Sequence, residues 1–210
     1  MTPVTVVDYG GGNVRSLCAA LERCGAQVTV SSDPAVVSSS DRLMLAGQGA
    51  AGATMRALEA TGLAEALRDA TARRIPLLGV CVGLQVLFEH SEEDDCVCLG
   101  LLPGSINRID GAERLPHLGW NDVEPLAEHP LTVDLPTVAY FAHSYAVAAN
   151  VPSALAANVP SALAVTHIDK ATIASIVGGG SVAGVQFHPE RSSEGGRQFL
   201  QRFLAWDGNA

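Results

Sequence analysis

Residues 76–89 read PLLGVCVGLQVLFE, and this stretch decides the fold. A short apolar run leads into the motif G-V-C-V-G at residues 79–83, and apolar residues at helical spacing follow at once. Glycines two residues to either side of a central residue let the backbone make a sharp strand-to-helix turn without a steric clash. The stretch therefore predicts a buried strand, a turn that lifts the side chain of Cys81 above the sheet edge, and a helix over residues 82–90.

The position of Cys81 in this turn predicts a nucleophile. Unpaired amides and the dipole at the start of the following helix favour a thiolate over a thiol, so the sulfur should react at neutral pH. The alternative is a structural cysteine in an apolar strand, because free cysteine also behaves as a small hydrophobic residue.

A histidine and a carboxylate follow a second apolar run near the C-terminus. Residues 185–190 read VQFHPE, in which His188 ends a β-prone run and Pro189 stops it. Glu190 can turn back and hold the imidazole in one tautomer, as the third member of a catalytic triad does. H-P-E alone is more often a surface turn, but a thiolate needs a base and a group that orients it. Together the motifs predict a triad of Cys81, His188 and Glu190.

Both motifs resemble those of the class I glutamine amidotransferases, which carry their triad on a cysteine elbow and a late H-P-E. The resemblance covers nearly the whole chain. It implies that Cys81 attacks the carboxamide of L-glutamine and that His188 acts as a base and then as an acid towards the leaving ammonia. Glu190 is implied to orient the imidazole.

The order of apolar runs predicts an α/β fold. Short β-type runs alternate with stretches at helical spacing, which is typical of a mostly parallel sheet with helices on both faces. The resemblance likewise implies a class I glutamine amidotransferase fold with a flavodoxin-like core. A β-rich excursion is expected to start at residues 100–109. The predicted strands of the core lie at residues 4–7, 27–30, 42–46, 163–166 and 173–177, and a closing helix lies at residues 195–204.

Composition limits the organisation and environment of the chain. Its 210 residues are 48% hydrophobic and 17% charged, so a single globular domain over residues 1–210 is expected. A net charge of -9 argues against nucleic acid or an anionic membrane as a partner. The sequence has no apolar run of ~18 residues and no basic start of a signal peptide, so a cytoplasmic location is expected.

Neither a disulfide framework, a metal site nor a cofactor is expected. The five cysteines are odd in number and form no C-x-x-C pair. Cys96 and Cys98 should share one face of a strand and pack as apolar side chains. The glycine-rich turn at residues 10–13 lacks the G-x-G-x-x-G spacing of a dinucleotide site.

A glycine-rich turn after the third predicted strand is expected to form an oxyanion hole. Its backbone N–H groups, at Gly47, Gln48 and Gly49, can stabilise negative charge that develops on the substrate. The amide of Val82, directly after the nucleophile, is the predicted second donor. Similar proteins commonly read P-G-x-G here with a hydrophobic residue between the glycines, whereas this chain has Ala46 and Gln48.

The resemblance also assigns residues to the glutamine pocket. Residues 140–145 read YFAHSY and resemble the family pattern Y-F-x-H-S-Y, whose last three residues line that pocket. A helix residue one turn after Cys81 and an acidic residue at the end of that helix are implied to bind the α-amino and carboxylate end, although both could simply be solvated. The predicted substrate-binding residues are Gln85, Glu93, His143, Ser144 and Tyr145.

Two segments resemble the glutaminase subunits of imidazole glycerol phosphate synthases in particular. They are DYGGGN at residues 8–13 and PHLGWN at residues 116–121. The resemblance implies a heterodimer with a cyclase subunit, a (β/α)8 barrel. That subunit uses the ammonia to make imidazole glycerol phosphate and an aminoimidazole carboxamide ribotide in histidine biosynthesis. The implied partner contacts are Tyr9, Asn13, Trp120 and Arg191.

Three other functions are compatible with the sequence. The chain could be the glutaminase subunit of another synthase, such as pyridoxal phosphate synthase, which the two segments above disfavour. It could be a free cysteine hydrolase of the same fold that acts on peptides or thioesters. It could also be a non-catalytic regulatory module, although the intact triad residues argue against that.

The octapeptide ANVPSALA at residues 149–156 is repeated letter for letter at residues 157–164. Two such copies are too short for a solenoid, which needs at least ~3 units of 20 or more residues. Proline in each copy disfavours a central strand. A local duplication in a surface loop is therefore expected.

Overall fold

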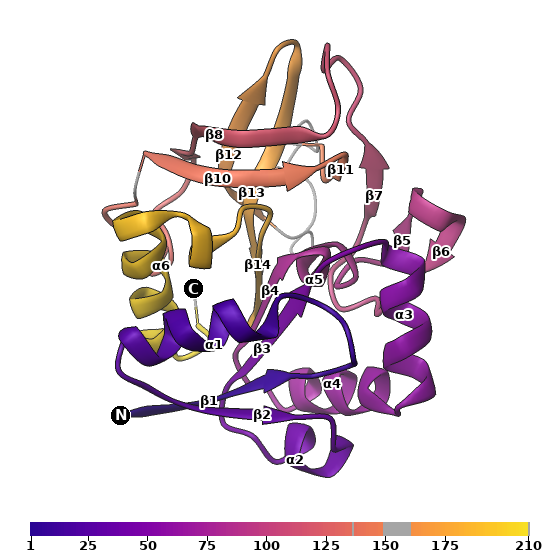
Figure 1. Ribbon diagram of the computed structural model, residues 1–210, viewed down its shortest axis with the longest axis vertical. Coiled ribbons are helices and arrows are strands. Elements are labelled where there is room, and N and C mark those ends of the chain that lie inside the picture. The colour runs from indigo at the N-terminus through magenta and orange to yellow at the C-terminus, as the bar shows by residue number, and fades with distance from the viewer. Residues whose placement is uncertain (136, 149–160, 210) are drawn as a thin grey trace.

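A computed structural model of the chain describes residues 1–135, 137–148 and 161–209 (Figure 1). Within these residues the central sheet has eight strands, in the order β2-β1-β3-β4-β14-β13-β12-β9. The first five strands are parallel, and the last three are antiparallel to their neighbours. The strands are β1 (Thr2–Val7), β2 (Ala26–Ser31), β3 (Leu43–Gly47), β4 (Leu77–Cys81), β9 (Glu124–Pro125), β12 (Ser161–Ile168), β13 (Ala171–Gly179) and β14 (Val182–Val185).

Helices cover the sheet on both faces. Strands β3 and β4 are buried at every residue, which requires a layer on each side. Helix α1 packs against α6, whereas α4 packs against α2 and α3. The predicted α/β fold with a mostly parallel sheet is thereby confirmed. The helices are α1 (Val14–Arg23), α2 (Pro34–Ser38), α3 (Ala51–Ala60), α4 (Leu63–Ala72), α5 (Val82–Gln85) and α6 (Ser193–Ala205), with 3-10 turns η1 (Glu93–Asp95) and η2 (Pro189–Arg191).

The predicted β-rich excursion forms two smaller sheets. One has four strands in the order β11-β7-β5-β6, and the other pairs β10 with β8. Figure 1 shows β8 and β10 side by side above the central strands. Their strands are β5 (His90–Ser91), β6 (Cys96–Val97), β7 (Ser105–Arg108), β8 (His117–Asp122), β10 (Val138–His143) and β11 (Tyr145–Ala146).

The sharp turn predicted at Cys81 is present. Strand β4 ends at Cys81, whose φ of 55° lies in the left-handed region that non-glycine residues rarely adopt. A Cβ atom on Gly83 would lie 2.0 Å from the carbonyl oxygen of Leu45, and one on Gly79 would lie 2.5 Å from the carbonyl oxygen of Gly83. Both glycines are therefore needed for the close approach of backbone to backbone.

The helix after this turn is shorter than predicted, because α5 ends at Gln85 rather than at residue 90. After Gln85 the backbone N–H groups of Leu87 and Phe88 donate to the carbonyl oxygens three residues before them, and the N–H of Glu89 donates to the carbonyl oxygen of Gly104 instead of that of Gln85. Residues bonded in this way do not continue the α-helical pattern, in which each N–H donates four residues back. A segment distant from the elbow thus holds Glu89 outside the helix, although the apolar spacing alone favoured a longer one.

The octapeptide duplication lies mostly outside the described residues. Only the last four residues of its second copy, 161–164, are described, and they begin β12. The expected surface loop is therefore wrong at residues 161–164, where the pairing with β13 makes a strand of the central sheet, and its part at residues 149–160 lies outside the described residues. None of the helices in the described part of the chain has the length and apolar character that a bilayer crossing requires.

Candidate active site

A cavity of about 390 Å³ opens above Cys81 at the ends of strands β3 and β4. His188 and Val82 line it beside the cysteine, and the turn at residues 47–49 forms another wall. The parallel register sets this arrangement, because Gly47 at the end of β3 pairs with Cys81 at the end of β4. The cavity therefore brings together the predicted nucleophile, the predicted base and the predicted oxyanion donors.

The predicted base and its orienting carboxylate are in contact. The imidazole Nδ1 of His188 lies 3.0 Å from Oε1 of Glu190, and the Glu190 side chain is 2% exposed. Burial by itself would lower the pKa of His188, but the Cys81 sulfur and the Glu190 carboxylate outweigh it and raise that pKa to about 10. The imidazole is therefore protonated at neutral pH, and its Nε2 remains available to the cysteine or a substrate.

The turn at residues 47–49 packs directly on the start of α5. A Cβ atom on Gly47 would lie 2.1 Å from the backbone nitrogen of Gly83, and Gly49 has a φ of 98°. Glycine is thus required at both positions, by space at Gly47 and by backbone conformation at Gly49. This close packing gives the backbone amides of the turn and of Val82 a common cavity.

The sequence matches one known protein family over most of its length. Residues 5–206 match the family described as "Glutamine amidotransferase class-I". The chain belongs to the class I glutamine amidotransferases. The predicted family membership is confirmed.

Two relatives of this amidotransferase have closely similar descriptions. The imidazole glycerol phosphate synthase subunit HisH of Thiobacillus denitrificans is 41% identical, covering 97% of this chain and 91% of that protein. The subunit HisH 1 of Pseudomonas aeruginosa is 40% identical, with 99% of each chain covered.

Solved structures support the fold alone. The structure described as PurLQS from Thermotoga maritima superposes with a TM-score of 0.74 at 20% identity, over 98% of this chain and 99% of that one. A structure described as a glutamine amidotransferase gives a TM-score of 0.74 at 18% identity, over 97% of this chain and 99% of the other.

None of the five residues predicted to bind glutamine lines the cavity of this amidotransferase. Gln85 is 2% exposed, and its Nε2 donates to the carbonyl oxygen of Tyr145 at 2.8 Å, so the alternative of a solvated helix residue is wrong. The same carbonyl oxygen lies 3.0 Å from Nδ1 of His143, which is also buried. Ser144 is half-buried, and its carbonyl oxygen accepts from the backbone of Ile109.

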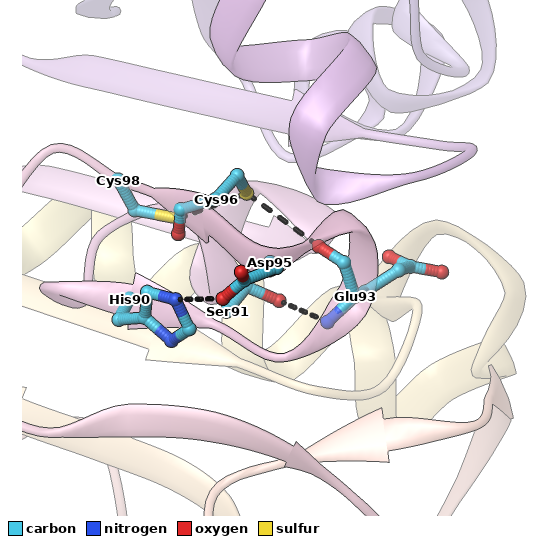
Figure 2. A network of polar contacts seen from close by, with 6 residues as sticks. All are labelled: His90, Ser91, Glu93, Asp95, Cys96 and Cys98. Atoms are coloured by element: carbon cyan, nitrogen blue, oxygen red, sulfur yellow. Dashed lines mark hydrogen bonds and ion pairs between the residues drawn. The ribbon is translucent and has the colours of Figure 1, made fainter.

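Glu93 holds the start of a helix. Its Oε2 accepts a hydrogen bond from the backbone N–H of Ala51 at 2.9 Å, at the N-terminus of α3. Figure 2 shows its backbone fixed as well, with the N–H donating to Ser91 Oγ at 3.2 Å and the carbonyl oxygen accepting from Cys96 Sγ at 3.5 Å. Glu93 thus lies beside the segment that follows the turn at residues 47–49, and the alternative of a freely solvated carboxylate is wrong.

Cys96 and Cys98 face each other, with their sulfur atoms 3.8 Å apart (Figure 2). Burial raises the pKa of Cys98 to about 12, so that its thiol stays protonated at neutral pH. A protonated, buried thiol is a poor nucleophile. Within the described residues, no group of three or more metal-binding side chains includes the pair.

Three of the four predicted partner residues lie at the surface. Arg191 and Asn13 line the cavity, and the guanidinium carbon of Arg191 lies 5.0 Å from the ring centroid of Tyr140. Trp120 is 53% exposed, and its ring meets that of Tyr140 edge-on at 6.1 Å between centroids. Tyr140 thus joins Arg191 and Trp120, and Asn13 lies on the cavity wall.

The fourth predicted partner contact, Tyr9, is wrong. Its side chain is 7% exposed and belongs to the main hydrophobic core. The ring folds back over the glycines that follow it, since a Cβ atom on Gly11 would lie 2.6 Å from Cε2 of Tyr9. The buried ring of Tyr9 therefore stabilises the glycine-rich turn by packing against it.

His143 is expected to make the fold sensitive to acid. Burial lowers its pKa from 6.5 to about 3. Between these values the unfolded chain binds a proton that the folded chain does not, so the free energy of unfolding decreases as the pH falls below about 6.5. The decrease for this group approaches ~1.4 kcal/mol per pH unit.

Urea unfolding of the parent chain and of His143→Gln measures this effect. The parent should be more stable at neutral pH, and its advantage should shrink by about 2 kcal/mol near pH 5. An advantage over His143→Gln that stays constant with pH would contradict the assignment of a neutral, buried imidazole.

Proposed function

We propose that the chain is the glutaminase subunit of an imidazole glycerol phosphate synthase. It hydrolyses L-glutamine to glutamate and ammonia and passes the ammonia to a cyclase subunit. The cyclase forms imidazole glycerol phosphate and an aminoimidazole carboxamide ribotide in histidine biosynthesis. The observation that carries this proposal is the cysteine at a strained strand-to-helix turn, facing a histidine that is bonded to a buried glutamate.

In the proposed reaction the thiolate of Cys81 attacks the carboxamide carbon of glutamine. The backbone amides of Val82 and of the turn at residues 47–49 stabilise the negative charge that develops on the carboxamide oxygen. The imidazolium of His188 donates its Nε2 proton to the nitrogen, the C–N bond breaks, and ammonia leaves a thioester on the sulfur. A water molecule then loses a proton to His188 and attacks the thioester, which releases glutamate and restores the thiolate.

The pocket for the rest of glutamine is proposed to involve the segment around residues 142–145. His143, Ser144 and Tyr145 remain the proposed contacts, together with Gln85 and Glu93. Because none of them lines the cavity, these contacts require the cavity to extend towards them when glutamine binds. The Nε2 of Gln85 already bonds to Tyr145, which leaves its Oε1 for the substrate.

The proposed partner is a cyclase built as a (β/α)8 barrel, in a cytoplasmic heterodimer. Ammonia released into water would be protonated and lost, so the cavity mouth has to face an enzyme that consumes it. The relatives named HisH, at about two fifths identity over nearly the whole chain, support this choice of partner. The chain is proposed to contribute one domain, residues 1–210, and no cofactor.

Glutamine-derived ammonia tests the proposal. The chain should be mixed with a cyclase subunit, and ammonia release should be measured with and without the phosphorylated ribulosyl-carboxamide substrate of the cyclase. The proposal expects glutamine hydrolysis that increases when the loaded cyclase is present. Absence of glutamine hydrolysis in the loaded complex would show that the function is wrong.

Arg191 is expected to position the two subunits. Its guanidinium group stacks on Tyr140 at the cavity mouth, is exposed, and directly follows the orienting Glu190. A basic group held in this way can pair with an acidic residue of the cyclase at the rim of the interface. Arg191→Ala should weaken subunit association by about fivefold to tenfold, as expected for the loss of one charged rim contact.

Binding isotherms at low and moderate salt measure this effect, since a charged rim contact weakens as salt screens it. Arg56→Ala, at an exposed position on α3, is a matched control that should leave association unchanged. The same affinity and the same ammonia transfer in Arg191→Ala and the parent would rule out a positioning role.

A further inference from the structure

We infer that Gln186 is a catalytic residue whose side-chain amide donates a hydrogen bond to the sulfur of Cys81 and stabilises its thiolate. The inference rests on the glutaminase function proposed above and adds a group that the triad does not contain. The Nε2 of Gln186 lies 3.9 Å from Cys81 Sγ, and the side chain is 0% exposed.

Strand register places this glutamine beside the nucleophile. Strands β14 and β4 are parallel, and Val185 pairs with Val80. Gln186 directly follows the end of β14 at Val185, and Cys81 directly follows Val80 at the end of β4, so this register places the two residues next to each other. A glutamine in the otherwise apolar run at residues 182–187 is the sequence signal for this contact.

The orientation of the amide follows from one carbonyl group. The backbone oxygen of Tyr145 can only accept, so the atom of Gln85 that lies 2.8 Å from it must be the Nε2 donor. That same Nε2 lies 3.3 Å from Gln186 and donates its second hydrogen there, so the atom of Gln186 that it meets must be Oε1. The remaining Nε2 of Gln186 is then the atom that faces Cys81 Sγ.

A second donor fixes the same carbonyl group from the other side. The Nδ1 of His143 lies 3.0 Å from the Tyr145 oxygen, and the Nε2 of His143 lies 3.2 Å from Nδ1 of His117. Since a carbonyl oxygen accepts two hydrogen bonds, Gln85 and His143 together satisfy it. Gln85 is thus a positioning residue for Gln186, because it holds the amide with its N–H group towards the sulfur.

Burial strengthens the hydrogen bond from Gln186 to the thiolate. With Gln85 and Gln186 almost fully buried, water does not compete for the amide hydrogens. A hydrogen bond to an ionised acceptor is stronger than one to a neutral acceptor, so the amide favours the thiolate over the thiol. The thiol has its own partner, because the Cys81 sulfur lies 4.0 Å from the carbonyl oxygen of Ala142, which can only accept from an S–H group.

Gln186 differs from the histidine in that its hydrogens do not change during the reaction. His188 loses its proton when ammonia departs and regains one from water before the thiolate forms again. A glutamine amide does not titrate, so its N–H group faces the sulfur in every state of the cycle. The titratable and charged groups near Cys81 are His188, with Glu190 behind it, and the phenol of Tyr9.

Alkylation of Cys81 by iodoacetamide tests the inference in the full chain. The rate is followed by mass spectrometry of the peptide that carries Cys81, across a range of pH. Gln186→Met keeps the length of the side chain and removes the donor. It should slow alkylation at neutral pH by about tenfold or more and raise the pH midpoint by about one unit, as the loss of one hydrogen bond to a charged group does.

A second variant distinguishes the loss of the hydrogen-bond donor from a packing defect. Gln186→Glu keeps the oxygen that accepts from Gln85, but above neutral pH its carboxylate has no hydrogen to donate, so it should slow alkylation at least as much. Gln201→Leu, at an exposed glutamine on α6, should alkylate at the parent rate. Gln85→Met should cause part of the same loss, and adding it to Gln186→Met should cause little more.

The outcome is independent of the proposed function, because alkylation needs neither glutamine nor a partner. If Gln186→Met and Gln186→Glu keep the parent melting temperature, alkylation rate and pH midpoint, the inference is overturned. If the parent alkylates readily at Cys81 but releases no ammonia from glutamine in the loaded complex, the proposed function is wrong. The alkylation rates of the Gln186 variants still decide whether Gln186 stabilises the thiolate.

Discussion

Replacing Cys81 with alanine is expected to abolish glutamine-dependent product formation in the complex with the cyclase subunit. The sulfur is the atom that forms the thioester, and among the described residues that line the cavity no other side chain is a nucleophile of comparable strength. We expect glutamine hydrolysis to fall by at least ~10⁴-fold, which is the scale seen when a triad enzyme loses its nucleophile. Product formation from added ammonium salt should remain, since only the glutaminase half needs the thiolate.

Both activities should be measured on the same preparation of the complex. Cys18→Ala removes a half-buried thiol on α1 and should leave both activities unchanged. Cys81→Ala that retains glutamine-dependent turnover would overturn the assignment of the nucleophile. Loss of the ammonium-dependent activity as well would point instead to a disrupted complex, which the binding isotherms detect.

His188→Ala is expected to cost more activity than Glu190→Gln. Without the imidazole there is neither an acid for the leaving ammonia nor a base for water, and each such group contributes ~10²–10⁴-fold. Glutamine at position 190 keeps an oxygen that can accept from Nδ1 of the imidazole. Its NH₂ group takes the place of Oε2, which has no hydrogen-bond partner within the described residues. Glu190→Gln therefore removes only the negative charge of the carboxylate. Because that charge helps to raise the pKa of His188, this pKa should decrease.

Steady-state kcat for glutamine hydrolysis in the loaded complex compares the two variants. Glu194→Gln changes an exposed carboxylate on α6 and is the matched control for the charge. Losses of equal size, or a larger loss in Glu190→Gln, would mean that the carboxylate does more than orient and charge the imidazole.

The nucleophile turn could be predicted because its physics is local. A five-residue motif with glycine at both ends dictates a turn that only such spacing permits, and the structure has Cys81 at a φ of 55°. His188 and Glu190 are two residues apart on one turn, so their 3.0 Å contact also depends on little beyond the chain between them. The parallel sheet followed from the repeated alternation of strand and helix patterns.

The features that were missed or misjudged depend on contacts between distant segments. The predicted helix over residues 82–90 stops early, and the backbone N–H of Glu89 bonds to Gly104 in a distant segment instead of to Gln85. The link from Gln186 to Gln85 spans 101 positions in the sequence and requires the register of β14 on β4. Tyr9 was expected to contact a partner from its glycine-rich turn. Because the following glycines have no side chains, its ring packs against them in the core.

The fate of the carboxamide nitrogen tests the central claim most directly. The complex is supplied with glutamine labelled isotopically at this nitrogen, together with an excess of unlabelled ammonium salt and the phosphorylated substrate of the cyclase. If the chain is a glutaminase that hands its ammonia to the cyclase, most molecules of imidazole glycerol phosphate should carry the label at one of their two ring nitrogens despite the excess. Label diluted to the level of the free ammonium pool would contradict the account.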